Sequence, residues 1–191
     1  MRKRHLYIAA GLGAATLAVL GASGGVSFAG APAAPTSDSL LGGPISVPPA
    51  LVPPAGNKLT SVFKASGVQI YGCTNGAWAL IEPAASLTGI TTVTPVKRVT
   101  ALHFRGPSWE SDQDGSLIEG TSPVSAPSDT PNSIPQLLVT AKTSARPGVF
   151  GGVTFIQRLA TVGGVAPAGT CAAGATTASA YRAVYRFFKA G

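Results

Sequence analysis

The chain has 191 residues, which is enough for one domain or at most two. Hydrophobic residues make up 45% of the sequence and charged residues only 11%, which argues against an ordinary charge-rich cytosolic domain. The formal net charge is +7, but three of the fourteen basic residues lie in the first four positions and most of the others are scattered singly. This distribution forms no basic stripe for binding phosphates, so we expect no nucleic-acid partner.

The first 29 residues predict a cleavable export signal. Basic residues at positions 2–4 precede an uncharged stretch, 6–26, and Ser27–Ala29 offers small residues where a signal peptidase cleaves. Glycines within the stretch lower its hydrophobicity and its helix propensity, which favours a signal over the alternative of an uncleaved membrane anchor. We expect cleavage after Ala29 and a secreted mature protein, extracellular or in the cell envelope, with no stable membrane span.

Residues 30–56 predict a proline-rich linker. Seven prolines lie between Ala31 and Gly56 among small residues. Proline fixes the backbone φ angle and lacks an N–H donor, so this segment should be extended and largely unable to join a sheet. We expect a tether that becomes ordered only near Val52–Asn57 and that leads into a single β-rich domain over residues 57–191.

The domain sequence consists of short alternating runs separated by turn residues. The clearest is a hairpin around Asn75-Gly76, because this pair tolerates the positive φ that tight hairpin turns require. At the C-terminal end, aromatic and β-branched content favours a strand with Tyr181, Tyr185 and Phe187 on one face, although a helix would also group aromatic rings there. The predicted strands are 68–73, 77–81, 96–105, 117–119, 135–142, 149–159 (with a bulge at Gly151-Gly152) and 181–188. No helix-length amphipathic segment separates them, so the predicted fold class is all-β, an antiparallel β-sandwich or barrel.

Cys73 and Cys171 are the only cysteines, and an exported protein favours a disulfide between them. The alternative is a metal site or a reactive thiol. It is weaker, because two cysteines and the one histidine of the mature protein cannot form a closed zinc site without carboxylate ligands. In the chain-entropy model, a bond that closes a loop of about 100 residues contributes roughly 4–5 kcal/mol to stability.

The most polar stretch, 103–116, holds most of the candidate functional residues: His103, Trp109, Glu110 and Asp114. Glu110 and Asp114 could form an acid–base pair with Trp109 as a sugar platform, or His103 and the acids could bind a divalent cation. The simpler interpretation, which we favour, is a hairpin with turn-forming Asp and Gly residues, a buried Trp109 and a hydrogen-bonded His103.

Arg158 is the remaining candidate. It lies beside Gln157 in an apolar run, and we expect it to be anchored to a buried carboxylate or to carbonyls, with a pocket-lining role as the alternative. Beyond the predicted signal, in which Gly21–Gly25 fits the pattern, the sequence has no G-x-S-x-G motif. Its glycine pairs precede no predicted helix, so it predicts neither a serine nucleophile nor a phosphate cradle. We therefore expect no cofactor and no metal, and we assign no catalytic residue.

Several of these segments, taken in order, resemble the domain-of-unknown-function 3455 family of secreted bacterial and fungal proteins, from about Val52 to the C-terminus. The segments are Gly67–Tyr71 with Cys73, Trp78, Glu82-Pro83, His103-Phe104, Gly106–Glu110, Asp114–Ser116, Ile134-Pro135, Leu137-Leu138, Phe155–Arg158, Thr161, Gly163-Gly164 and Pro167 with Cys171. The chain departs from the family at Gln136, where a tryptophan is usual. The resemblance implies secretion and a compact domain, and it implies no reaction.

These observations predict a secreted, non-catalytic domain that binds a ligand or a cell-envelope component near His103, Trp109, Glu110 and Asp114. The alternative is an extracellular hydrolase that uses Glu110 and Asp114. The two hypotheses differ in geometry. Carboxyl groups that face one cleft beside an exposed Trp109 would favour an enzyme, whereas splayed carboxyl groups and a buried Trp109 would favour binding or structure.

Overall fold

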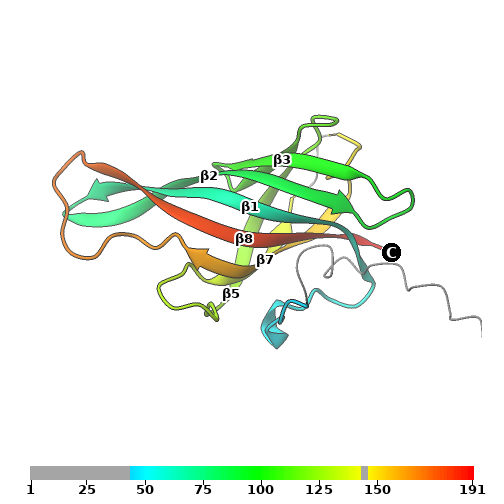
Figure 1. Cartoon of the computed structure of the whole chain (residues 1–191), viewed down its shortest axis with the longest axis horizontal. Coiled ribbons are helices and arrows are strands. Elements are labelled where there is room, and N and C mark those ends of the chain that lie inside the picture. The colour runs from blue at the N-terminus through cyan, green and yellow to red at the C-terminus, as the bar shows by residue number, and fades with distance from the viewer. Residues whose placement is uncertain (1–43, 143–145) are drawn as a thin grey trace, which may run out of the picture. The chain divides into compact units, whose positions relative to one another are not determined.

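A computed structural model describes residues 44–142 and 146–191. The predicted signal and the first part of the predicted linker lie outside the described residues. Each of eight antiparallel strands pairs with the next along the chain, and β8 pairs with β1, so the sheet closes into a barrel (Figure 1). The elements are η1 (Pro49–Leu51), β1 (Asn57–Thr74), β2 (Ala77–Thr91), β3 (Arg98–Phe104), β4 (Ser108–Ser111), β5 (Leu117–Ala126), β6 (Gln136–Ala141), β7 (Val153–Gly163) and β8 (Thr176–Ala190). The all-β prediction is confirmed, and the structure is the barrel of the two architectures it allowed.

The β1–β2 hairpin turns at the predicted residues, with φ of 52° at Asn75 and 78° at Gly76. β2 pairs with β3 only over Ala85–Ile90, and β8 pairs with β7 only as far as Tyr181. The end of β1, the start of β2 and the start of β8 therefore continue past the other strands as a three-stranded ribbon (Figure 1).

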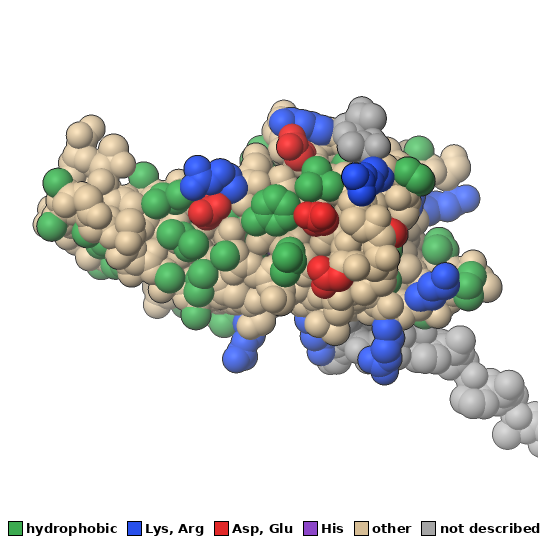
Figure 2. Space-filling model, turned by 90° about the horizontal axis from the view of Figure 1, so that it is seen from above, with side chains coloured by type: hydrophobic (Ala, Val, Ile, Leu, Met, Phe, Trp, Pro, Cys, Tyr) green, Lys and Arg blue, Asp and Glu red, His purple; other side chains and the backbone are tan. Residues whose placement is uncertain are grey.

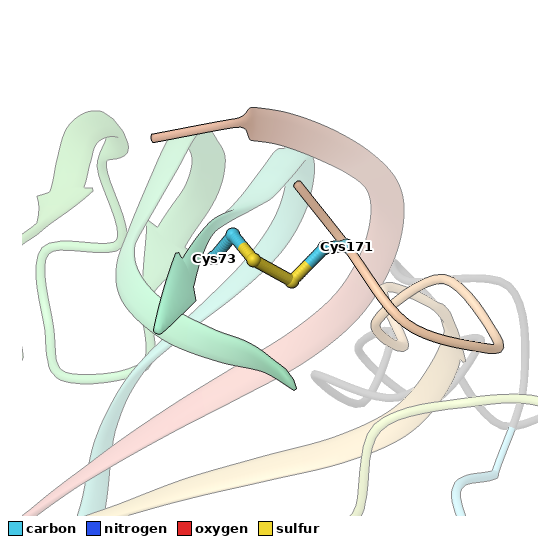
Figure 3. The surroundings of a disulfide bond; sticks show 2 residues. All are labelled: Cys73 and Cys171. Atoms are coloured by element: carbon cyan, nitrogen blue, oxygen red, sulfur yellow. A yellow bond between two sulfur atoms is a disulfide. The ribbon is translucent and has the colours of Figure 1, made fainter. Parts of the chain in front are cut away.

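The predicted disulfide joins Cys73 and Cys171, across a sequence separation of 98 residues. It ties the end of β1 to the segment that precedes β8 (Figure 3). Two backbone hydrogen bonds reinforce the link, from the Cys73 N–H to the Ala175 carbonyl and from the Cys171 N–H to the Gly76 carbonyl. The hairpin tip and the last connection of the chain are thus held together by covalent and backbone contacts.

Alternate side chains along the strands point inward and form the core. Phe63, Phe150 and Phe187 pack in mutual contact, with the ring centroids of Phe150 and Phe187 4.5 Å apart. Tyr181 and Tyr185 are buried in the same cluster as Phe187, as the period-two pattern predicts for β8.

Two glycines differ from their predicted role. Gly151 and Gly152 lie in the turn before β7 instead of in a bulge within it, and the Gly151 N–H donates to the Gly148 carbonyl. The pairing irregularities of β7 lie at Val153/Phe155 and Leu159/Val162. Because a tight turn and a bulge both recruit glycine, the Gly-Gly pair alone does not separate them.

The segment before β1 packs against the outside of the barrel. The side chain of Leu51 is fully buried in a second cluster with Leu138 and Leu159. The Gln157 side-chain amide donates to the Leu51 carbonyl over 2.6 Å. The described part of the predicted linker, from Pro44 onward, therefore contributes to the domain's packing.

Charged side chains are spread over the surface. On the face drawn in Figure 2, basic and acidic groups stand next to one another, and hydrophobic side chains lie between them. Arg105 forms an ion pair with Glu82, and Lys142 forms one with Glu119. Such exposed pairs contribute little to stability.

Candidate functional site

A cavity of about 410 Å³ lies among residues of seven strands and the β3–β4 turn. Most of its lining is apolar, and a small group of polar side chains joins it. The lining residues are Gln69, Leu80, Ile81, Glu82, Pro83, His103, Arg105, Gly106, Pro107, Trp109, Leu137, Val139, Arg158 and Tyr185. Of the candidates from the sequence, His103, Trp109 and Arg158 meet here.

His103 is a buried, neutral member of the lining. Its Nδ1 lies 2.8 Å from the Ser108 carbonyl, so this nitrogen carries the proton and donates it. Burial lowers the pKa of His103 to about 4, although the hydrogen bond to Ser108 acts in the opposite direction. Near pH 7 its Nε2 is therefore an acceptor, and the residue brings no charge to the cavity.

Trp109 is 1% exposed and stacks on His103. Gly120 on β5 makes room for the indole, since a Cβ at that position would lie 3.2 Å from Trp109 Cζ3 and 2.5 Å from Val139 Cγ1. Trp109 Nε1 finds no hydrogen-bond partner among the described residues. The same is true of the Nε2 of Gln69, which is 2% exposed. Two buried polar groups of the lining are thus unsatisfied, which is uncommon in folded proteins.

Arg158 is half-buried, and a backbone carbonyl anchors its guanidinium. Anchoring to carbonyls is one of the two arrangements predicted from the sequence. Its Nε and Nη2 donate to the Pro135 carbonyl over 3.2 and 2.9 Å. No Asp or Glu in the described ranges forms an ion pair with it. Burial raises the pKa of Tyr185, and the positive charge of Arg158 opposes that rise. Arg158 therefore places an uncompensated positive charge beside the cavity.

The rim of the cavity carries the remaining charges. Arg105 Nε lies 3.2 Å from Glu82 Oε2, so the two opposite charges largely cancel. Leu80 is 56% exposed and Ile81 39% exposed, which gives the rim an apolar side open to solvent.

Glu110 and Asp114 lie elsewhere. Neither lines the cavity, although Glu110 is the next residue after Trp109, because neighbouring side chains on a strand point to opposite faces. The Asp114 carboxylate accepts hydrogen bonds from the Ser116 N–H and hydroxyl and from the Val149 N–H. Burial raises the pKa of Asp114, but these hydrogen bonds outweigh it and leave the pKa below its usual value. Asp114 thus has the turn-forming role of the simpler interpretation.

The described residues lack the features that a metal site or a membrane-spanning helix requires. Within residues 44–142 and 146–191, no three or more His, Cys, Asp and Glu side chains gather as a metal site would need. Among the described residues, no two acids therefore lie near enough to His103 to complete a divalent-cation site. The same residues contain no helix of the length and hydrophobicity needed to cross a membrane.

The sequence of the barrel matches one known protein family. Residues 54–189 match the family described as Protein of unknown function (DUF3455). The chain belongs to this family. No curated protein and no solved structure matches it. The DUF3455 match covers nearly all of β1 through β8, so the matched region contains the whole barrel of this chain except its last residue, Ala190.

The segments that carry the DUF3455 resemblance concentrate at the cavity. Nine of the lining residues belong to them: Gln69, Glu82, Pro83, His103, Gly106, Pro107, Trp109, Leu137 and Arg158. Four polar lining residues were not candidates from the sequence: Gln69, Glu82, Arg105 and Tyr185. Of these, Gln69 and Tyr185 are buried. Alternation along β1 and β8 marks both as inward-facing, but it does not show which inward positions border empty space.

Gln136, the departure from the DUF3455 pattern, does not line the cavity. It is fully buried elsewhere, where its Nε2 donates to the Pro127 carbonyl and its Oε1 accepts from the Ala160 N–H. Its side chain joins two backbone segments. The cavity of this DUF3455 protein is therefore built without that position.

Proposed function

We propose that this DUF3455 protein is a secreted, non-catalytic binding protein that holds a small, mainly apolar ligand in its barrel cavity. The observation that carries the proposal is the cavity between His103, Trp109 and Arg158. Its volume, about 410 Å³, falls within the range of small-molecule sites, and apolar walls with a few convergent polar groups are typical of them. The Phe63–Phe150–Phe187 cluster fills the interior elsewhere, so the open space is local.

The unsatisfied polar groups support a bound ligand. Leaving a buried donor without a partner costs about 1–3 kcal/mol. A ligand that accepts hydrogen bonds from Trp109 Nε1 and the Gln69 amide would recover that cost on binding. Ser61 Oγ and Gln157 Oε1 also lack partners among the described residues, but neither residue lines the cavity.

The chemistry of the lining favours binding over hydrolysis. It contains no Ser, Thr or Cys that could act as a nucleophile, and its one carboxylate, Glu82, is paired with Arg105. Glu110 and Asp114, the pair that hydrolysis would use, do not line the cavity, and Trp109 is buried. This geometry supports the binding hypothesis over the hydrolase.

Secretion is supported by the N-terminal sequence together with the disulfide, because disulfides form and persist in oxidising compartments. N-terminal sequencing of protein recovered from the medium or cell envelope tests this part. We expect the mature chain to begin between Gly30 and Ala34. An intact Met1 on a membrane-bound protein would contradict it.

Binding is tested by thermal shift with a panel of small aromatic and branched aliphatic compounds. Leu137→Trp should fill the cavity, whereas Leu102→Trp adds the same ring on the exposed face of β3. We expect at least one compound to raise the melting temperature of the wild type and of Leu102→Trp, but not of Leu137→Trp. Equal shifts in Leu137→Trp, or no shift with any compound, would refute the proposal.

A further inference from the structure

We infer that the ligand of the barrel cavity is an apolar acid: a compact hydrocarbon or aromatic body that carries one carboxylate, which pairs with Arg158. This inference rests on the proposed binding function and specifies the class of ligand. It follows from which charges the cavity holds, which donors it leaves unused and how much space it offers.

The cavity has one uncompensated charge. Its charged lining residues are Glu82, Arg105 and Arg158, and the first two form an ion pair. His103 is neutral near pH 7. Arg158 has no carboxylate partner in the described part of the chain, so an anion in the cavity would be the first to neutralise it.

Arg158 also has donors left to use. A guanidinium carries five N–H donors, and two of them go to the Pro135 carbonyl. A further contact reaches the Tyr185 hydroxyl, which lowers the pKa of that buried tyrosine against the larger effect of burial. The Pro135 carbonyl fixes the position of the guanidinium, and the remaining N–H groups can meet a carboxylate oxygen.

Donors dominate the other polar groups of the cavity. Trp109 Nε1 can only donate, and the Gln69 amide can present its NH2 group. Both call for oxygen acceptors on the ligand. A cationic ligand would face Arg158 without a free carboxylate, so the lining disfavours amines.

The apolar walls define the rest of the ligand. Leu80, Ile81 and Pro83 come from β2, and Leu137 and Val139 come from β6. These side chains offer no hydrogen bonds to a second polar group. The matching ligand is therefore a hydrophobic body with its polar atoms at one end.

The test compares matched acid and alcohol pairs: 2-naphthoate with 2-naphthalenemethanol, and 4-phenylbutyrate with 4-phenylbutanol. Dissociation constants are measured by calorimetry at pH 7 on the mature protein. We expect the wild type to bind each acid at least about tenfold more tightly than its alcohol. Arg158→Gln should bring the two affinities within about threefold by weakening the acid, whereas Arg182→Gln, an exposed arginine of β8 outside the lining, should keep the preference.

The outcomes separate the two proposals. If acids and alcohols bind the wild type equally well, the acid inference fails and the binding function stands. If Arg158→Gln keeps the preference, Arg158 is not the partner and the inference fails. If no member of either pair binds, the inference and the binding of this ligand class fail together.

A second measurement needs no variant. The carboxyl carbon of labelled 4-phenylbutyrate is followed by NMR on the wild-type complex as the pH is lowered from 7. Pairing with Arg158 should keep the pKa of the bound acid at or below its value in water. Burial without a cation would raise that pKa, and a raised value would overturn the inference even if Arg158→Gln did not fold.

Discussion

The imidazole of His103 lies flat on the indole of Trp109, with ring centroids 4.4 Å apart and planes within 4° of parallel. Tyr185 packs edge-on against both rings, at 5.3 Å from His103 and 5.7 Å from Trp109. Three strands thus bring aromatic rings together at the wall of the cavity. Because His103 can be protonated, the stability of this wall should depend on pH.

Acidification should destabilise the protein through His103. Its pKa is about 4 in the folded chain and 6.5 in an unfolded one, so the unfolded state binds the proton first. The stabilising effect is complete above pH 6.5 and is lost as the pH falls toward 4, by roughly 3 kcal/mol. Urea unfolding between pH 7 and 4 measures it.

His103→Gln serves as the control, because a glutamine can still donate to the Ser108 carbonyl but does not titrate. The variant should lose the slope between pH 6.5 and 4. Asp114, whose pKa is lowered mainly by its hydrogen bonds to Ser116, acts in a separate window below about pH 4. A wild type whose stability is flat from pH 6.5 to 4 would contradict the prediction.

The two acids of the polar stretch should differ in their importance for stability. Asp114→Asn removes the charge that accepts hydrogen bonds from Ser116 and Val149, so we expect a loss of about 1–2 kcal/mol. Glu110→Gln should change the free energy of unfolding by less than about 0.5 kcal/mol. Chemical denaturation at pH 7 compares them, and a larger loss for Glu110→Gln would contradict this assignment.

Local and unique signals made much of the fold predictable. Asn75-Gly76 specified the hairpin by its φ angles, and the only two cysteines specified the disulfide. The aromatic alternation in β8 placed Tyr185 in the core. Each of these inferences used either a few neighbouring residues or the only two cysteines, which have no other cysteine to pair with.

The cavity required information that no local pattern holds. Gln69 belongs to β1, Arg158 to β7 and Tyr185 to β8, and only closure of the barrel brings them to one space. Likewise, the prolines before β1 correctly exclude a strand, but they do not report that Leu51 packs on the barrel. Contacts between distant parts of the chain decided both.

Leu51 should stabilise the domain although it lies in the predicted linker. Its side chain is fully buried against Leu138 and Leu159, so Leu51→Ala should lower the free energy of unfolding by about 2–4 kcal/mol. The neighbouring Val52 is 56% exposed, and Val52→Ala should cost less than about 0.5 kcal/mol. Urea unfolding of both variants tests the difference. Equal effects would mean that the segment does not pack against the barrel in solution.

Removal of the disulfide should lower stability without altering the cavity. The Cys73→Ser/Cys171→Ser double variant frees a loop of 98 residues, and the chain-entropy model gives a loss of about 4–5 kcal/mol. Because this cost arises mainly in the unfolded chain, the folded double variant should bind the same compounds as the wild type at temperatures well below its lowered melting point. Urea unfolding and calorimetry measure the two effects. An unchanged unfolding midpoint would show that the link contributes nothing to stability, and lost binding by a folded variant would show that the ribbon it fastens helps to shape the cavity.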